Sequence, residues 1–349
     1  MKKNNDGITE EEMIQLETFQ NYLLQSRNIL AVVGAGLSAA SGLSTFRGTG
    51  GLWRNYSPID LATPDAFDMD PGLVWQFYSS RRYQAMKAKP NKGHFALAEL
   101  SRRRPSTFLT LTQNVDGLSS RAKHEKNTIL ELHGSLFTLK CTSFFCNYSH
   151  EDNREHPLTP ALANCEDEFP QKRKQEQPEP DDQSQHQSKR RKLNEPINKD
   201  LEDAKAISSS NVSSNVSSPD FKPVQTIPER DLPHCPECKE GLLRPGVVWF
   251  GESLPLKVMD AADDFLMTHR IDLVLVIGTS GTVWPAMGYI ERAQRKGAKV
   301  AVFNTEIDNL EKLKKKGDWG FLGDASKWLP VALEPVIGSE YLPRNWKKF

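Results

Sequence analysis

The amino-acid sequence predicts an α/β fold, in which a doubly wound parallel sheet is accompanied by a second, smaller domain. Short apolar runs recur along the chain, and polar or glycine-containing residues follow each of them. Segments with helical spacing lie between these runs. Two closely spaced cysteine pairs stand apart from the runs, on either side of a long polar stretch. The runs predict the sheet, and the cysteines predict the smaller domain.

Helices are expected at the N-terminus and between the first two strands. Residues 9–26 carry apolar side chains at helical spacing, which predicts an amphipathic helix packed on the first strand. Pro71 suits the first turn of a helix that runs to about residue 87, and a further helix is expected near residues 94–102. The apolar positions of the N-terminal helix are Met13, Leu16, Phe19, Leu23 and Leu24.

The first predicted strand, residues 29–33, leads directly into the segment GAGLSAASGLSTFRGTGGLW. Gly34, Gly36 and Ala39 have the spacing of a turn that presses backbone amides and a helix N-terminus against a pyrophosphate. This spacing predicts a dinucleotide site, for which a purely structural glycine turn is the alternative. A redox domain would carry a ribose-binding acid about 20 residues later. The only nearby acid is Asp60, in a loop-like SPID stretch, which disfavours a simple dehydrogenase.

Further strands are expected to end in polar tips. They comprise residues 107–112, 128–132, 271–277 and 299–303, and they lead into TQNVDGL, HGS, GTSGT and NTE. Ligands of open α/β sheets bind outside the carboxyl ends of the strands. The sequence therefore places the site along this edge of the sheet.

Composition bounds the class of protein. The chain of 349 residues holds 45 Lys+Arg and 45 Asp+Glu, so no overall charge favours nucleic acid or another charged partner. No run of about 18 apolar residues could span a bilayer, and the acidic first twenty residues do not resemble a secretory or mitochondrial leader. We therefore expect a soluble intracellular protein without direct nucleic-acid or membrane contacts.

Residues 151–228 interrupt the pattern with a long polar stretch. Glu, Gln, Pro, Ser, Asn and Lys dominate it, so it cannot bury enough apolar surface to order itself. The sequence thus predicts a disordered surface insertion. Its basic cluster, Lys189, Arg190, Arg191 and Lys192, fits either a nuclear localisation signal or a solvated run of charge.

The cysteines predict a metal site. Cys141 and Cys146 close the short loop CTSFFC, and Cys235 and Cys238 close the loop CPEC. Two such pairs in an intracellular protein predict one tetrahedral Zn²⁺ site with four cysteine ligands, separated here by the polar insertion. Four thiolates leave no open coordination position, so this zinc would be structural. Cys165 lies in the polar stretch and is not an expected ligand.

The motifs occur in one order: GAGLSAASGLSTFRG, TQNVDGL, HGS, two cysteine pairs, GVVWFGE, GTS and NTE. In this order they resemble the sirtuin family of NAD-dependent protein deacylases, from about residue 30 to about residue 330. The resemblance implies a Rossmann-type large domain and a small zinc-bearing domain, with NAD and an acylated lysine meeting between them. NAD would be a co-substrate, acylated-lysine proteins or peptides would be the partners, and nicotinamide and O-acyl-ADP-ribose would be products.

The resemblance also implies roles for individual residues. His133 would be the general base, since an imidazole can take a proton from a ribose hydroxyl near neutral pH. Asn114 and Asp116 would hold the nicotinamide and ribose in this catalytic set. The other expected cofactor-binding residues are Gly34, Ala35, Gly36, Ser38, Ala39, Thr45, Phe46, Arg47, Trp53, Gln113, Val115, Gly278, Thr279, Ser280, Asn304, Thr305, Glu306 and Ala325.

The substrate is expected to meet two parts of the chain. The extended segment from Gly246 to Glu252 would pair with the peptide as an added strand, and an ordinary buried strand is the alternative. Tyr78 and Arg81 lie on one helix face and match the YxxR pair of the sirtuin subgroup that includes the mitochondrial desuccinylase and demalonylase. The expected substrate-binding residues are Tyr78, Arg81, Val248, Trp249, Phe250, Gly251 and Glu252.

An arginine and a phenol together can bind a carboxylate, which an acetyl group lacks. We therefore expect removal of succinyl, malonyl or glutaryl groups, with deacetylation of histones or other proteins as the closest alternative. Mono-ADP-ribosyl transfer and a non-catalytic NAD-binding chromatin module are alternatives of other classes. The intact set of His133, Asn114 and Asp116 argues against the module.

The sequence departs from relatives at Ser44, where many carry proline, in the four-residue spacing of the first cysteine pair, and in its basic insertion. The N-terminus and the basic cluster favour cytoplasm and nucleus, whereas the subgroup resemblance suggests mitochondria. The expected organisation is an N-terminal helical segment 1–28, a large domain 29–136 and 243–335, a zinc domain 137–150 and 229–242, the insertion 151–228, and a tail 336–349.

Overall fold

The computed structural model describes residues 9–44, 53–163, 226–279, 284–308, 310–344 and 346. Its larger sheet has six parallel strands in the order β3-β2-β1-β7-β8-β9. Numbered along the chain within this sheet, the order is 3-2-1-4-5-6, which is the Rossmann order. The predicted doubly wound sheet is therefore confirmed. Its strands are β1 Ile29–Val33, β2 Phe108–Thr112, β3 Ile129–Glu131, β7 Leu273–Ile277, β8 Lys299–Asn304 and β9 Trp319–Leu322.

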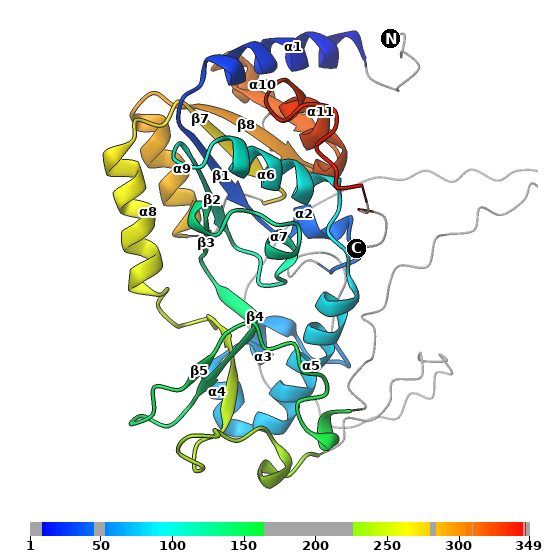
Figure 1. Ribbon diagram of the computed structural model, residues 1–349, viewed down its shortest axis with the longest axis vertical. Helices are drawn as coiled ribbons and strands as arrows, with labels where there is room; N and C mark the ends of the chain where they lie inside the picture. Colours follow the sequence, from blue (N-terminus) through cyan, green and yellow to red (C-terminus); the bar gives the residue numbers. More distant parts are fainter. Residues whose placement is uncertain are drawn as a thin grey trace, which may run out of the picture. The chain divides into compact units, whose positions relative to one another are not determined.

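Helices cover both faces of this sheet (Figure 1). Alternate side chains of β1 point to opposite faces, so Ala31 packs with α1, α6 and α11, whereas Val32 packs with α8 and α9. Both faces are apolar, which explains why the central strands are continuous apolar runs. The covering helices are α1 Glu10–Gln25, α6 Lys92–Arg103, α8 Leu256–Thr268, α9 Ala286–Arg295 and α11 Ala325–Ile337; shorter helices are α2 Gly36–Ala39, α7 Leu118–Arg121 and α10 Leu310–Lys315.

The N-terminal helix α1 forms where the sequence predicts it. Thr9 and Glu12 make a reciprocal capping box at its first turn. Phe19 packs edge-on against aromatic rings of β8 and β9, at centroid distances from 5.3 to 5.9 Å. Met13 and Leu24 are 42% and 55% exposed, so the buried face is narrower than expected, and it covers the far strands of the sheet as well as the first.

The smaller sheet is antiparallel, with the order β5-β4-β6. Helices of the segment 58–87 share one apolar cluster with it, in which Trp75, Phe77 and Trp249 are buried. The SPID stretch, expected as a loop, forms the short helix α3. The elements are β4 Gly134–Cys141, β5 Ser149–His150, β6 Leu243–Val247, α3 Pro58–Leu61, α4 Pro64–Met69 and α5 Pro71–Lys87; single 3₁₀ turns are Lys126–Thr128, Pro160–Leu162 and Glu229–Asp231.

The predicted bounds of the disordered insertion, residues 151–228, are too wide at both ends. Residues 151–163 and 226–228 belong to the folded part, because Leu162 and Ile227 are buried in the cluster of the smaller sheet and Asn153 is buried against Arg82. The remaining insertion, with Cys165 and Lys189 to Lys192, lies outside the described residues. Four expected cofactor-binding residues also lie outside them: Thr45, Phe46, Arg47 and Ser280. The other proposed domain boundaries stay predictions.

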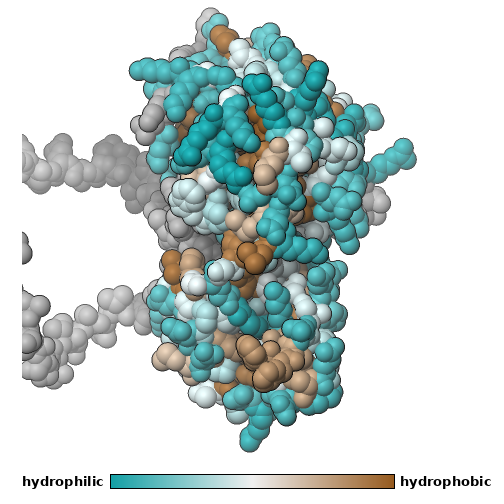
Figure 2. Space-filling view, turned by 90° about the vertical axis from the view of Figure 1, so that its left-hand side faces the viewer, coloured by the Kyte–Doolittle hydropathy of each residue, from teal (hydrophilic) through white to brown (hydrophobic). Residues whose placement is uncertain are grey.

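Figure 2 shows one face of the molecule, which is mostly hydrophilic with apolar side chains gathered in a few patches. The exposed apolar residues include Phe144 and Phe145 in the loop of the first cysteine pair, at 91% and 94%, and Phe250 beyond β6. Within the described part of the chain, every helix is too short or too polar to cross a membrane.

Candidate active site and cysteine cluster

The glycine turn after β1 is pressed against the end of β7. Gly34 N–H donates to Ile277 O and Gly36 N–H to Gly278 O, both at 2.8 Å. A Cβ on Gly36 would lie 2.7 Å from the Cα of Gly278, so this approach requires glycine. Ala35 N–H has no acceptor among the described residues, which leaves an amide for an anionic ligand. The turn thus fits the predicted pyrophosphate role and lies where the strand order reverses.

A buried polar network joins α2, α6 and the segment after β2. Ser38 Oγ donates to Asp116 Oδ2 at 2.6 Å, and Asn114 Nδ2 donates to Gly34 O at 3.0 Å and to Ser38 Oγ at 3.3 Å. Asp116 Oδ1 accepts from Leu118 N–H at 2.9 Å. The structure therefore brings three of the predicted cofactor-binding residues, Ser38, Asn114 and Asp116, together through side-chain hydrogen bonds.

His94 belongs to this network, and the sequence analysis missed it. Its Nδ1 accepts from Asn91 N–H at 3.2 Å, so the neutral ring carries its proton on Nε2, which lies 3.5 Å from Ser38 Oγ. Burial lowers the pKa of His94 to about 4, against the opposing charge of Asp116. The ring is therefore neutral at pH 7. The GHF sequence offered one signal, a histidine three residues after the N-cap asparagine.

His133 lies directly after β3, next to the end of β2. Its Nδ1 is 3.1 Å from Gln113 O. Because a carbonyl only accepts, this bond places the proton on Nδ1 and leaves Nε2 able to act as a base. Burial lowers the pKa of His133 below its ordinary value of 6.5, and the bond to Gln113 opposes this shift. Gln113 Oε1 also accepts from Thr279 Oγ1 at 3.0 Å, which links the tips of β2 and β7.

The remaining expected cofactor-binding residues lie in different surroundings. Asn304, at the end of β8, donates through Nδ2 to Thr279 O at 3.3 Å, and its Oδ1 accepts from Thr305 N–H. Glu306 is exposed. Ala325 begins α11 and is buried in the sheet's core, and Trp53 is buried against Phe77, at 5.5 Å between ring centroids. Ala39 is exposed on α2, and Val115 is partly buried against the smaller sheet's cluster.

Tyr78 and Arg81 lie on α5, on the side of the smaller sheet. Tyr78 is 1% exposed, and burial raises its pKa to about 12, although the charge of Arg81 opposes the shift. Burial lowers the pKa of Arg81, opposed by the charges of Tyr78 and Asp116. Arg81 therefore lies within electrostatic reach of both the phenol and the Ser38–Asp116 network.

The expected extended segment from Gly246 to Glu252 is only partly extended. Strand β6 ends at Val247, and Val248 N–H donates to His133 O at 2.9 Å. Residues 249–252 form a turn, closed by a bond from Glu252 N–H to Trp249 O at 3.0 Å, because Gly251 takes φ +90°. The turn buries Trp249 and leaves Phe250 49% exposed.

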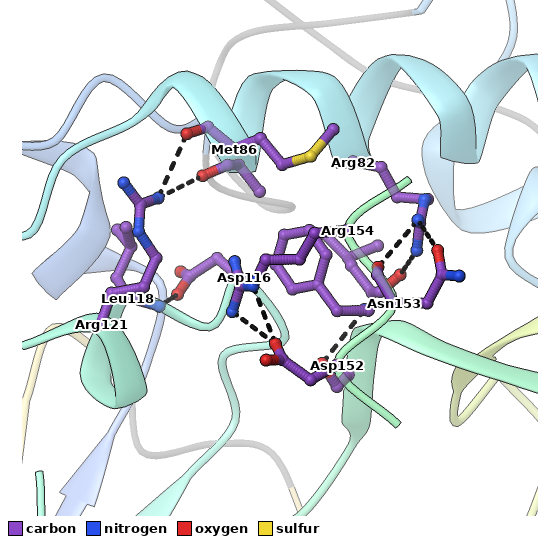
Figure 3. A network of polar contacts seen from close by, with 12 residues as sticks. Arg82, Met86, Asp116, Leu118, Arg121, Asp152, Asn153 and Arg154 are labelled. Atoms are coloured by element: carbon purple, nitrogen blue, oxygen red, sulfur yellow. Dashed lines mark hydrogen bonds and ion pairs between the residues drawn. The ribbon is translucent and has the colours of Figure 1, made fainter. Parts of the chain in front are cut away.

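Arg82, next to Arg81, is fully buried, and it joins α5 to the segment after β5 (Figure 3). Its guanidinium donates to Leu136 O at 2.5 Å, to Asn153 Oδ1 at 2.8 Å, and to Glu155 O at 3.1 Å. Arg121, on α7, donates through Nη1 to the carbonyl of Ala85, near the C-terminal end of α5, at 2.9 Å. These cations hold the helix that carries Tyr78 and Arg81.

The four cysteines predicted as zinc ligands lie close together. Their Sγ atoms all lie within 4.8 Å of one another, with 3.6 Å between Cys141 and Cys238 and 3.7 Å between Cys146 and Cys235. A tetrahedral site with Zn–S bonds of about 2.3 Å has S···S distances of about 3.8 Å. The cluster thus fits one structural Zn²⁺. Gly241 N–H donates to Cys238 Sγ at 3.4 Å, and a Cβ on Gly241 would lie 2.7 Å from Cys141 Sγ.

Comparisons with known proteins agree with this geometry. The sequence profile of the Sir2 family matches residues 34–174 and 200–285. A Candida albicans protein named NAD-dependent protein deacylase is 53% identical over 93% of this chain and 98% of its own length. The NAD-dependent protein deacylase sirtuin-5, mitochondrial, of Canis lupus familiaris is 36% identical over 91% of this chain and 84% of its own.

The fold has a counterpart of the same family among solved structures. A crystal structure described as a Sir2 homologue–NAD complex has a TM-score of 0.62 and 30% identity, and covers 94% of each chain. The likeness thus extends over both the six-stranded sheet and the region of the cysteine cluster. With the Rossmann strand order, the polar strand tips and the cysteine cluster in one chain, this protein belongs to the Sir2 family.

Proposed function

We propose that this protein is an NAD-dependent protein deacylase that removes acidic acyl groups, such as succinyl, malonyl and glutaryl, from lysine side chains. The observation that supports the acidic preference is the pair of Tyr78 and Arg81. The phenol is buried and neutral, and the guanidinium beside it is desolvated. A guanidinium and a phenol together can bind a carboxylate with charge assistance, and an acidic acyl group supplies that carboxylate.

The residues of the sheet edge would hold NAD. The turn from Gly34 to Ala39 suits the pyrophosphate, and the Ser38–Asp116 network suits the nicotinamide and its ribose. Bound NAD supplies a ribosyl carbon that becomes electrophilic when nicotinamide leaves, and an amide oxygen can attack it. His133 Nε2 would take a proton from a ribose hydroxyl, while Gln113 O holds the ring's other nitrogen. Zinc, with four thiolates around it, would stabilise the fold and take no part in this chemistry.

The test compares two peptides that differ only in carrying succinyl-lysine or acetyl-lysine. Nicotinamide release and lysine exposure are followed with NAD for the wild type and for Arg81→Met. Loss of a charge-assisted bond is expected to lower kcat/KM for the succinyl peptide by about 10- to 100-fold. Lys87→Met, which removes an exposed charge near the end of the same helix, is the matched control and should leave kcat/KM unchanged for both peptides.

The outcomes separate the alternatives. Faster acetyl turnover that Arg81→Met leaves unchanged would make the protein a deacetylase. Nicotinamide release without lysine exposure would indicate ADP-ribosyl transfer or NAD hydrolysis. A chain that binds NAD but releases no nicotinamide would be a binding module.

A further inference from the structure

Trp249 and Tyr78 make a buried side-chain contact between segments that are far apart in the sequence. The indole Nε1 of Trp249 donates to the hydroxyl oxygen of Tyr78 at 2.9 Å, across 171 residues of chain. Both side chains are buried, with 3% and 1% of their surface exposed. The contact therefore joins the turn after β6 to the helix that carries Arg81.

The chemistry of the two groups fixes the direction of this bond. An indole N–H can only donate, so the phenol oxygen must accept. Among the described residues, the Tyr78 hydroxyl donates to no other group. Burial keeps the phenol protonated, since it raises its pKa to about 12. No described residue of the chain thus takes the phenol proton, which is left for another acceptor.

Trp249 itself is held firmly. The guanidinium of Arg244 lies 3.4 Å from the centroid of its ring, and Phe67 lies 5.3 Å away between ring centroids. Arg244 donates to both carboxylate oxygens of Glu252, at 2.6 and 2.9 Å, and Glu252 also accepts from Trp249 N–H at 2.8 Å. The Arg244–Glu252 ion pair therefore braces the turn 249–252 and fixes the plane of the indole.

We propose that Trp249 is a positioning residue for acyl specificity, because its indole N–H turns the Tyr78 hydroxyl so that the phenol proton meets the acyl carboxylate. This inference rests on the proposed function. A carboxylate gains from the directed donor beside Arg81, whereas an acetyl group offers no oxygen at its end. Arg244 and Glu252 act through Trp249 and do not touch the substrate in this scheme. The WFGE sequence thereby takes a part in acyl selection as well as in peptide binding.

The test is a double-mutant cycle on Trp249→Phe and Tyr78→Phe, with succinyl and acetyl peptides. Trp249→Phe should lower the succinyl-to-acetyl ratio of kcat/KM by about 3- to 10-fold, as expected for one lost hydrogen bond, mainly through the KM of the succinyl peptide. In the Tyr78→Phe background the same change should leave the ratio unaltered, because no hydroxyl remains to be turned.

Two further variants keep the test independent of folding. Replacing Trp249 with 3-benzothienylalanine exchanges the indole N–H for sulfur at nearly constant shape, and should reproduce the loss. Trp75→Phe is the matched control, because the Trp75 indole donates to the backbone carbonyl of Leu243 at 2.8 Å in the same apolar cluster. It should lower stability and leave the succinyl-to-acetyl ratio unchanged.

The results distinguish the two proposals. If Tyr78→Phe lowers the ratio but the Trp249 variants do not, or if the two effects simply add, the positioning role is wrong and the acidic preference stands. If Tyr78→Phe and Arg81→Met both leave the ratio unchanged, the acidic preference itself fails. A fall in the ratio with Trp75→Phe equal to that with Trp249→Phe would reduce the effect to loosened packing.

Discussion

The two sheets of this protein are held together by different means. In the larger sheet, every residue of β1, β2 and β7 is buried, and apolar helices cover both faces. In the smaller sheet, both residues of β5 are exposed and β4 is buried only in part. The smaller sheet packs with α5 in an apolar cluster, and it also carries the cysteine cluster, the buried Arg82 and the Arg244–Glu252 pair. Both regions thus bury apolar side chains, and the region of Tyr78 and Arg81 is linked in addition by these polar contacts.

Removal of zinc is expected to have the largest effect, and it should fall on the smaller sheet. Structural zinc sites contribute about 10–16 kcal/mol of binding free energy in isolated peptides, and this contribution is lost when the metal is removed. A chelator or Cys235→Ser should abolish deacylation and release one zinc per chain, while far-UV circular dichroism keeps most of its amplitude. Cys165→Ser is the control, since that residue is not an expected ligand. Full activity in the metal-free protein would contradict this account.

His133→Ala tests the other region, at the tip of β3. Loss of a general base is expected to lower kcat by about 10²- to 10⁴-fold. NAD affinity, measured by calorimetry, should stay near that of the wild type, because the glycine turn and the Ser38–Asp116 network are unchanged. The wild type should keep its activity somewhat below pH 6.5, since burial lowers the pKa of His133, and lose it as the ring becomes protonated. Survival of turnover in the variant would remove the assigned role.

Acid should lower the free energy of unfolding of the region around the larger sheet, through buried histidines. Burial lowers the pKa of His124 to about 4, against 6.5 for the unfolded chain, although a backbone bond to Thr128 opposes the shift. Between these values the unfolded chain binds a proton that the folded chain does not, so the stability present above pH 6.5 is lost as the pH falls toward 4.

His124→Phe removes this titrating group and keeps a ring beside Phe108. The loss of unfolding free energy between pH 7.5 and pH 5 should become smaller than in the wild type by about 2 kcal/mol. Urea unfolding at the two pH values measures it. An unchanged loss would show that His124 does not set the acid sensitivity.

Local patterns predicted the sheet edge and the zinc ligands, whereas contacts across long separations could not be predicted. The glycine turn, the TQNVDGL and HGS tips and the two cysteine loops each span a few residues, so their positions could be read locally, and the order of the motifs implied their chemistry through the family resemblance. Leu162 and Ile227 are single apolar residues in polar sequence, and only the tertiary cluster shows that they are buried. The contact from Trp249 to Tyr78 depends on a turn where the sequence predicted an extended strand.

The smallest effect compares two matched threonine N-caps, one in each region. Thr9 caps α1 over the larger sheet, and Thr63 caps α4 beside the smaller one by accepting from Ala66 N–H. Each change to alanine should cost about 1 kcal/mol, because one backbone donor of the first turn loses its acceptor. If the regions unfold as one unit, both variants shift a single transition equally. If zinc holds the region of the smaller sheet as a separate unit, two unfolding transitions should be seen. Thr63→Ala will then shift only the transition that chelation also shifts, and Thr9→Ala will shift only the second transition. Equal shifts in the metal-free protein would contradict the separation of the two regions.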